Sequence, residues 1–217
     1  MSTDNHRRSP AIARGYLAGR RPANAGQTYP VEVLTAREVS GLLNACSKRA
    51  PTGLRNRALI VVLYRGGLRL AEALDLMPKD IDEAAGAVTV LRGKGKKRRV
   101  TGLDPTAFAV LERWLAERRR RGLARKPIFC TLDGQKLDTS YVRRLLPRLA
   151  VQAGIEKRVH AHGLRHTHAF ELAAEGIPPH LIQAQLGHDS LATTDRYLRH
   201  VAPRELLNTM RARVWEP

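Results

Sequence analysis

The spacing of apolar residues along the chain predicts a protein built mainly of helices. Thr35 and Glu38 form the pattern of a capping box, and the apolar residues that follow recur at helical spacing. Residues 51–53 (Pro-Thr-Gly) are expected to end this first helix. Residues 54–65 are rich in apolar side chains, which predicts a second, largely buried helix. Periodicity and flanking start and stop signals predict further helices at residues 70–76, 105–121, 139–152, 163–175, 178–186, 190–200 and 203–214.

Two segments depart from the helical pattern. Residues 87–92 and 98–103 alternate between apolar and polar positions, as in two antiparallel strands joined by a basic turn. Residues 127–132 are expected to form a short strand or extended segment. The expected fold class is therefore mainly α with a small antiparallel β-sheet (α+β), in one domain that covers residues 31–217.

Residues 1–30 differ in composition from the rest of the chain. They hold five arginines and one acidic residue, and three prolines and three glycines interrupt them. This composition predicts a flexible basic arm rather than a packed segment. Two interpretations stay open: an arm that touches DNA, and a disordered leader without a role.

The charge of the chain indicates a polyanionic partner. The 217 residues include 38 Lys plus Arg against 20 Asp plus Glu, a net charge of +18, and nucleic acid is the commonest partner of so basic a protein. A membrane surface fits less well, since there is neither a long apolar run nor a strongly amphipathic basic helix. The aromatic content of 5% argues against a protein that stacks single-stranded bases. Two distant cysteines and no apolar signal-peptide core in residues 1–30 favour the cytoplasm.

The strongest candidate chemistry lies in the last third of the sequence. His162 and Arg165 are three residues apart on a predicted helix, and His188 and Tyr197 follow in that order. A tyrosine is a weak nucleophile at its free pKa of about 10 and needs activation. The planar guanidinium of arginine matches phosphate oxygens, so the set suits attack on a phosphodiester. Taken singly, His188 could equally cap a helix and Tyr197 could be a half-buried core residue.

The histidines around His162 also require a zinc site to be considered. His162 and His166 are four residues apart on one helix face, but Gly163 stands where a metalloprotease motif has Glu. No set of cysteines or carboxylates lies nearby in the sequence. We therefore expect no metal.

Two upstream segments add positive charge. Arg69 precedes Glu72 by one helical turn, so the two can form either a purely structural pair or a pair that leaves part of the guanidinium for a phosphate. Lys94 stands between two glycines at the tip of the predicted hairpin, which would let it approach a ligand closely, although a solvated basic turn explains it equally well. The other basic residues of this turn are candidate DNA contacts, namely Lys96, Lys97, Arg98 and Arg99.

These residues occur in one order within four short stretches. The stretches are GLRLAE (67–72), RGKGKK (92–97), HGLRHT (162–167) and LGH (186–188) followed by Tyr197. Together they resemble the catalytic domain of tyrosine recombinases, the family of phage-type integrases and Xer chromosome-dimer resolvases, over roughly residues 32–205. The resemblance implies the tyrosine recombinase catalytic-domain fold. It also implies a site-specific recombinase that cleaves and rejoins DNA through a 3′-phosphotyrosyl intermediate, in integration, excision or inversion.

The resemblance gives each candidate residue a role in transfer of the phosphate. The implied roles are nucleophile for Tyr197, ligands of the non-bridging oxygens for Arg69 and Arg165, proton acceptor or oxygen ligand for His162, hydrogen-bond donor to the phosphate for His188, general acid for Lys94, and support of Arg69 for Glu72. The implied chemistry needs no cofactor and no metal, because the phosphotyrosine link conserves the bond energy and the arginines neutralise the charge.

The resemblance also implies how the protein assembles. We expect double-stranded DNA as substrate, a monomer when free, a homotetramer on DNA, and in some systems an accessory DNA-binding protein. Family members usually carry an N-terminal core-binding domain of about a hundred residues; here some 30 residues stand in that place, as in the compact fimbrial-switch invertases. The helix expected after Tyr197 either packs on its own domain or docks on a neighbouring subunit. A type IB topoisomerase and a DNA-binding regulator that has lost cleavage remain the alternative functions.

Overall fold

The computed structural model describes residues 32–91, 98–187 and 210–211 of the chain. It confirms a mainly helical domain with one small antiparallel sheet. The helices are α1 (Ala36–Asn44), α2 (Pro51–Tyr64), α3 (Leu70–Asp75), the 3-10 helix η2 (Pro78–Asp80), α4 (Pro105–Arg120), α5 (Thr139–Gln152), α6 (Ala161–Ala174) and α7 (Pro179–Leu186). The strands are β1 (Ile81–Asp82), β2 (Ala87–Leu91) and β3 (Arg98–Gly102).

Local signals in the sequence explain where the first helices begin. Thr35 and Glu38 form the predicted capping box of α1, with the Thr35 hydroxyl accepting from the Glu38 N–H at 3.2 Å and the Glu38 carboxylate accepting from the Thr35 N–H at 2.6 Å. The expectation that residues 51–53 end this helix without joining the next one was wrong. They form the first turn of α2, because proline has the φ angle of a first helical turn and lacks an N–H that would go unpaired there.

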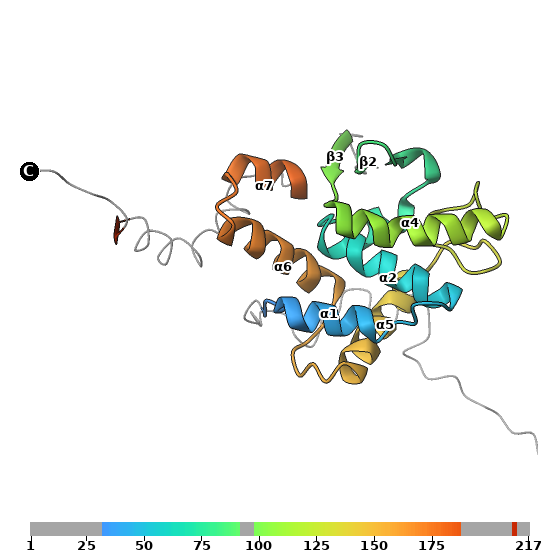
Figure 1. Cartoon of the computed structure of the whole chain (residues 1–217), viewed down its shortest axis with the longest axis horizontal. Coiled ribbons are helices and arrows are strands. Elements are labelled where there is room, and N and C mark those ends of the chain that lie inside the picture. Colours follow the sequence, from blue (N-terminus) through green and yellow to red (C-terminus); the bar gives the residue numbers. More distant parts are fainter. Residues whose placement is uncertain (1–31, 92–97, 188–209, 212–217) are drawn as a thin grey trace, which may run out of the picture. The chain divides into compact units, whose positions relative to one another are not determined.

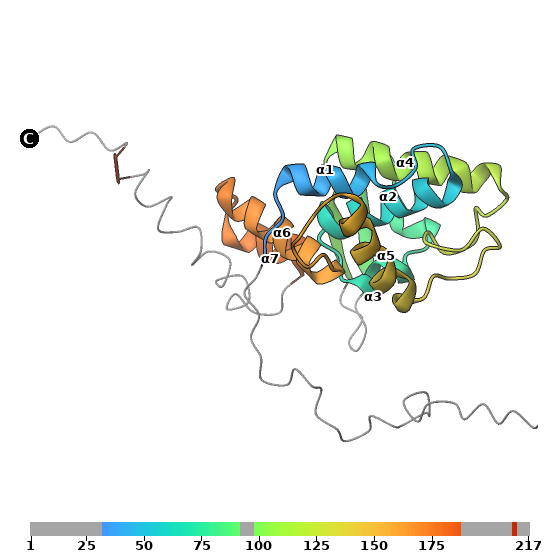
Figure 2. The same ribbon diagram turned by 90° about the horizontal axis from the view of Figure 1, so that it is seen from below.

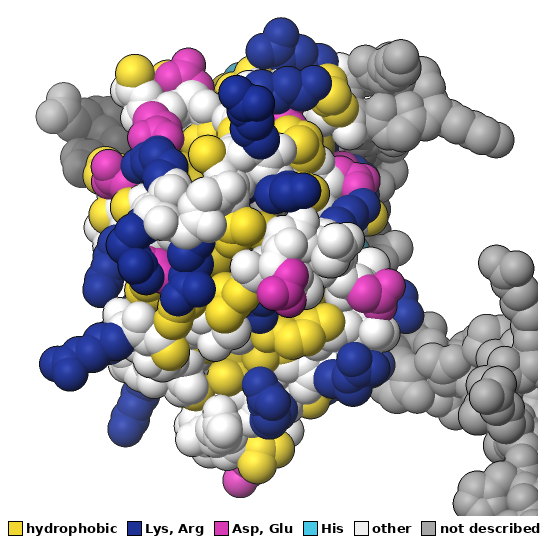
Figure 3. Space-filling model, turned by 90° about the vertical axis from the view of Figure 1, so that its right-hand side faces the viewer, with side chains coloured by type: hydrophobic (Ala, Val, Ile, Leu, Met, Phe, Trp, Pro, Cys, Tyr) yellow, Lys and Arg dark blue, Asp and Glu magenta, His cyan; other side chains and the backbone are white. Residues whose placement is uncertain are grey.

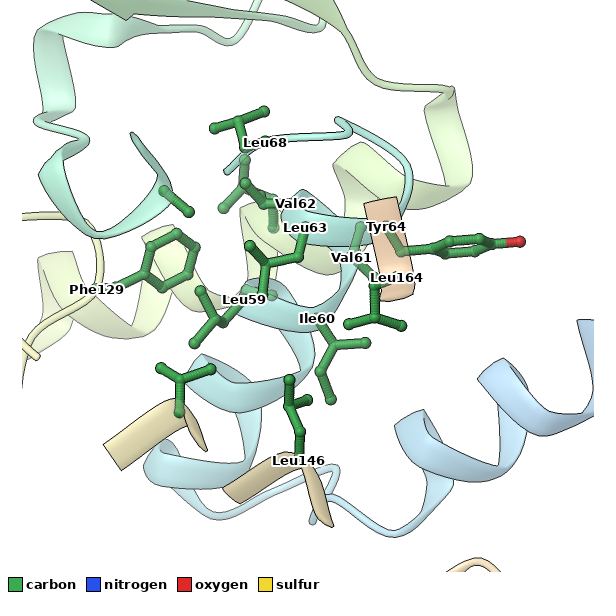
Figure 4. Packing of buried hydrophobic residues seen from close by; sticks show 14 of the residues in the cluster. Leu59, Ile60, Val61, Val62, Leu63, Tyr64, Leu68, Phe129, Leu146 and Leu164 are labelled. Atoms are coloured by element: carbon green, nitrogen blue, oxygen red, sulfur yellow. The ribbon is translucent and has the colours of Figure 1, made fainter. Parts of the chain in front are cut away.

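Helix α2 is the centre of the domain. Figures 1 and 2 show α4 and α6 flanking it, and both helices contact it. Every residue from Ala58 to Leu63 is at most 3% exposed, so this helix is apolar all round, as a buried helix should be. In Figure 4 its side chains spread in several directions, toward Leu146 of α5, Leu164 of α6 and Phe129. The resulting core fixes the elements that carry the candidate residues.

The sheet is a three-stranded antiparallel meander with the order β1-β2-β3. Strand β2 pairs with β3 in the register that places Val90 opposite Arg99 and Leu91 opposite Arg98. Strand β1 has only two residues, too few for alternation to be visible in the sequence. The segment predicted as extended at 127–132 contributes one isolated bridge, between Cys130 and Lys136.

Helix α7 is held between α6 and the sheet. Ala169 and Ala173 of α6 pack against Ile182 and Leu186 of α7 in a second, smaller hydrophobic cluster. On the other side, the Gln185 amide accepts from the Gly102 N–H at 3.1 Å and donates to the Gly102 carbonyl at 2.9 Å. These contacts fix the end of α7 close to β3.

Several predicted segments lie outside the described residues. These are the arm at residues 1–30, the tip of the hairpin, and almost all of the helices expected at 190–200 and 203–214. Within the described part of the chain, no helix is both long enough and apolar enough to cross a bilayer.

Candidate active site

The structure describes six of the candidate residues. They are Arg69, Glu72, Arg98, Arg99, His162 and Arg165. The other five fall outside the described residues and keep the status of sequence predictions: Lys94, Lys96, Lys97, His188 and Tyr197.

Arg69, His162 and Arg165 come together at one groove with a volume of about 770 Å³. Arg69 stands at the start of α3 and the other two residues on α6, so segments about ninety residues apart in sequence meet here. The residues that line the groove include apolar side chains, such as Leu68 and Leu146, and basic ones, such as Arg143 and Lys157. A groove lined by apolar and cationic side chains together can accept an anion.

Arg69 is placed by Glu72, as the sequence spacing predicted. The Glu72 carboxylate accepts from the Arg69 backbone N–H at 2.9 Å and from its Nη1 at 2.9 Å, which caps the start of α3. The Arg69 side chain remains 43% exposed, so its guanidinium can still reach a ligand. Burial raises the pKa of Glu72, but hydrogen bonds from Arg99 and from the Arg69 N–H outweigh this and lower the pKa to about 2. Glu72 is therefore a carboxylate at neutral pH.

Arg165 is positioned quite differently. It is 2% exposed, and its Nη1 donates to the Gly67 carbonyl while its Nη2 donates to the Leu186 carbonyl at 2.8 Å. Gly67 has a φ of +60°, and a Cβ there would lie 2.6 Å from Leu186 Cδ2, so only glycine fits this close approach. The α2–α3 connection and the end of α7 thus hold Arg165 in one orientation.

His162 lines the same groove as the two arginines. Partial burial, followed by the positive charges of Arg165, His160 and Arg69, lowers its pKa below the ordinary value of 6.5. The ring is therefore neutral at pH 7 and able to accept a proton or a hydrogen bond. It packs edge-to-face on His166, with ring centroids 4.0 Å apart. Among the described residues, no three His, Cys, Asp or Glu side chains form a group that could hold a metal ion.

The end of α7 contacts both arginines of the groove. The Leu186 carbonyl accepts from Arg165, and the Gly187 carbonyl lies 3.4 Å from Arg69 Nη2. Gly187 ends the helix in the left-handed conformation, with φ 64°. Carbonyls at a helix C-terminus carry partial negative charge, which favours the two cations.

Arg98 and Arg99 were predicted together as DNA contacts, but the structure separates them. Arg98 is exposed and its Nη2 lies 3.4 Å from the Thr89 hydroxyl. Arg99 is directed inward, with its Nη1 and Nη2 at 3.0 and 2.9 Å from the two oxygens of Glu72. This contact was not predicted from the sequence. Strand alternation contained a signal, since residue 99 shares its face with Thr101, which is fully buried.

Comparison with known proteins identifies relatives of the chain. Residues 32–204 match the model of the phage integrase family. The chain is similar to the tyrosine recombinase XerC of Xanthomonas campestris pv. campestris (strain B100), with 37% identity over 186 residues, 86% of this chain and 56% of that protein. It also resembles the crystal structure of XerA recombinase, with a TM-score of 0.75 and 30% identity over 92% of this chain and 72% of the other.

A second solved structure is the XerH site-specific recombinase bound to palindromic difH substrate, in a post-cleavage complex. It is 30% identical with a TM-score of 0.69, over 82% of this chain and 52% of the other. The chain spans little more than half the length of the XerC relative, at 56%. The family model nevertheless covers most of the chain, and the fold agrees with it. The chain therefore belongs to the phage integrase family, the family of the Xer-type tyrosine recombinases.

Proposed function

We propose that this protein is a site-specific DNA recombinase that cleaves and rejoins DNA strands through a 3′-phosphotyrosyl intermediate. The observation that carries the proposal is the meeting of Arg69, His162 and Arg165 at one groove. These residue types suit a phosphodiester, because two guanidinium groups can bind its oxygens and a neutral imidazole can take a proton. Membership of the family supports the same reaction.

In the proposed reaction, Tyr197 is the nucleophile. Its hydroxyl oxygen bonds to the scissile phosphorus and gives up its proton to His162, while the bond from phosphorus to the 5′-oxygen breaks. Lys94 supplies the proton that the departing 5′-oxygen needs. Rejoining is the reverse reaction, in which a 5′-hydroxyl displaces the tyrosine. The bond energy is kept in the phosphotyrosine link, so the cycle as proposed requires no nucleotide and no cofactor.

The arginines stabilise the transition state of this transfer. Negative charge gathers on the equatorial oxygens of the pentavalent phosphorus, and cations held in place before the reaction stabilise it more than the ground state. Arg165 is held by two backbone carbonyls and Arg69 by Glu72, so little reorganisation is needed. His188 would add a hydrogen bond to the same oxygens. Losing one such donor commonly lowers the rate by about 10²–10³.

Duplex DNA is the proposed substrate, bound by a tetramer that forms from free monomers, with an accessory protein in some settings. The net charge of +18 supports binding of a polyanion. Lys and Arg side chains are also spread over the face of the domain shown in Figure 3. The XerH relative was crystallised on its difH DNA substrate. We place the reaction in the cytoplasm, which suits the two free, buried cysteines.

The proposal is tested by trapping the covalent adduct. The full chain is incubated with a pool of nicked duplexes whose sequence around the nick is randomised, and protein-linked DNA is recovered and amplified over several rounds. We expect enrichment of one sequence and a 3′-linked adduct at Tyr197 by peptide mass spectrometry. Mixing two such duplexes then reports strand exchange, which a relaxing enzyme of the topoisomerase type would not give.

Tyr197→Phe is the decisive variant and Tyr141→Phe its matched control. Both lose one phenolic hydroxyl, and that of Tyr141 lies away from the groove, hydrogen-bonded to Arg55 and Asn56. We expect no adduct from Tyr197→Phe and normal adduct from Tyr141→Phe. Equal adduct yields from Tyr197→Phe and the unaltered chain would refute the assignment of the nucleophile, and DNA binding without any adduct would indicate a regulator.

A further inference from the structure

We infer that Arg99 is a positioning residue of this site, which holds Glu72 and keeps the charge of Arg69 available to a phosphate. The inference rests on the proposed function, because it assigns Arg99 a part in that reaction. It replaces the expectation that Arg99 contacts DNA directly. The support comes from its hydrogen bonds, its burial and its packing against the end of α7.

Arg99 binds Glu72 through both of its terminal nitrogens. The distances are 3.0 Å from Nη1 to Oε1 and 2.9 Å from Nη2 to Oε2, and both side chains are only 10% exposed. A planar guanidinium that meets a carboxylate in this two-point manner fixes the plane of the carboxylate as well as its position. The same nitrogens are not presented to solvent, where a DNA phosphate would have to bind them.

Glu72 transmits this restraint to Arg69. Its two oxygens accept two hydrogen bonds from Arg99 and two from Arg69, one of them from the Arg69 backbone N–H. The side chains of the two arginines and one glutamate together carry one net positive charge. Without Arg99, the carboxylate would face Arg69 alone, and the pair presented to a phosphate would be neutral.

The packing of Arg99 against Gly187 connects it to the end of α7. A Cβ at Gly187 would lie 2.5 Å from Arg99 Cδ and 2.7 Å from its Nε, so the guanidinium stem lies directly on the glycine backbone. The Nε of Arg99 is buried without a hydrogen-bond partner. An unpaired buried donor destabilises the fold. A side chain that keeps this position despite the loss of stability is consistent with a role at the site.

Arg99 therefore connects three segments at the candidate site. It belongs to β3, it binds the first turn of α3, and it packs on Gly187, which caps the end of α7. Through Glu72 it acts on Arg69, which in turn lies 3.4 Å from the Gly187 carbonyl. Its own atoms need not touch the DNA for its removal to slow the reaction.

The test compares Arg99→Gln with Arg119→Gln. Each variant removes one positive charge and one Arg–Glu pair, but the Arg119–Glu83 pair lies on the surface, with the two side chains 51% and 49% exposed. The adduct is followed on the nicked duplex enriched by the unaltered chain, at saturating DNA, and the dissociation constant for the same duplex is measured separately. We expect Arg99→Gln to slow adduct formation about 10–100-fold, the range commonly lost when a residue that orients a functional side chain is removed. Its DNA affinity should equal that of Arg119→Gln.

Two further variants separate positioning from fold stability. Arg99→Lys keeps the charge without the two-point geometry, so its rate should lie between those of the unaltered chain and Arg99→Gln. Because Arg99 acts through Glu72, Arg99→Gln combined with Glu72→Gln should be no slower than Glu72→Gln alone. Unfolding midpoints above the assay temperature for all variants exclude simple loss of fold.

The outcomes for the two proposals are distinguishable. Adduct formation by the unaltered chain supports the proposed function whatever Arg99 does, and its absence would overturn both. Arg99→Gln that cleaves as fast as Arg119→Gln would overturn the inference alone. So would a normal rate at saturating DNA together with a weaker DNA affinity, since Arg99 would then be a DNA contact. Multiplicative losses in the double variant would also overturn it.

Discussion

Replacing Arg165 and Arg69 in turn by methionine should separate two ways of holding an arginine of the candidate site. Arg165 is 2% exposed and donates to the carbonyls of Gly67 and Leu186, both buried residues. Methionine fills much of the same space but leaves both carbonyls without these bonds. Each unpaired buried group costs about 1–3 kcal/mol, and removal of a buried charge offsets part of that. We expect a loss of about 2–4 kcal/mol in the free energy of unfolding.

Arg69→Met is the matched comparison. The Arg69 side chain is 43% exposed and its ion pair with Glu72 sits at the surface of the groove, so its removal should cost about 0–1 kcal/mol. Urea unfolding followed by circular dichroism measures both values. For a slope of about 2 kcal/mol per molar urea, Arg165→Met should shift the midpoint by about 1–2 M and Arg69→Met by less than about 0.5 M. Both should slow adduct formation about 10²–10³-fold. Equal stability of the two variants would refute the role given to the carbonyl bonds of Arg165.

Three further predictions concern His168, Gly187 and Gln185. Burial, followed by the charge of Arg65, lowers the pKa of His168 from 6.5 to about 4. The folded state therefore loses about 3 kcal/mol of stability as the pH falls from 6.5 toward 4, where the buried ring must take up a proton. His168→Leu should reduce the dependence of the free energy of unfolding on pH, measured in urea between pH 7 and 4.5. An unchanged dependence on pH would show that His168 is not its source. Gly187→Ala should abolish most adduct formation, because a methyl group there strains a backbone with a φ of 64° and displaces Arg99. Gly154→Ala is the control: its φ is also positive but the space around it is open, so this variant should lose stability and keep its activity. Gln185→Leu should increase hydrogen exchange in α7 and at Gly102, since both Gly102 bonds are lost; protection equal to that of the unaltered chain would argue that other contacts hold the helix.

Local signals in the sequence were enough to predict most of the elements. The helix predicted at residues 139–152 is found with the same ends as α5, because Asp138 caps its first turn and apolar residues line one face. The capping box at Thr35 could also be predicted, because it depends only on residues three positions apart. Where two signals conflicted, as at Pro51, the sequence alone could not decide whether proline ended one helix or began the next.

The sequence also supplied the identities of the candidate residues and their order, and it predicted the pair of Arg69 with Glu72, which depends on one helical turn. It could not give their environments. Arg69 and Arg165 look alike in the sequence, yet one is 43% exposed and the other 2%. Lys94, His188 and Tyr197 lie outside the described residues and keep the roles that the family resemblance implies.

Only the tertiary structure decided how the candidate residues support one another. Arg165 reaches Gly67 across 98 positions of sequence, and Arg99 reaches Glu72 across 27. Spacing along the chain specifies contacts within one helix or one hairpin, because those depend on a fixed period. Contacts between elements depend on how the core around α2 packs, which places α3, α5 and α6 around one groove and α7 against β3. The identities and order of the candidate residues can thus be read from the sequence, while the burial of Arg165 and the restraint of Glu72 by Arg99 arise from packing.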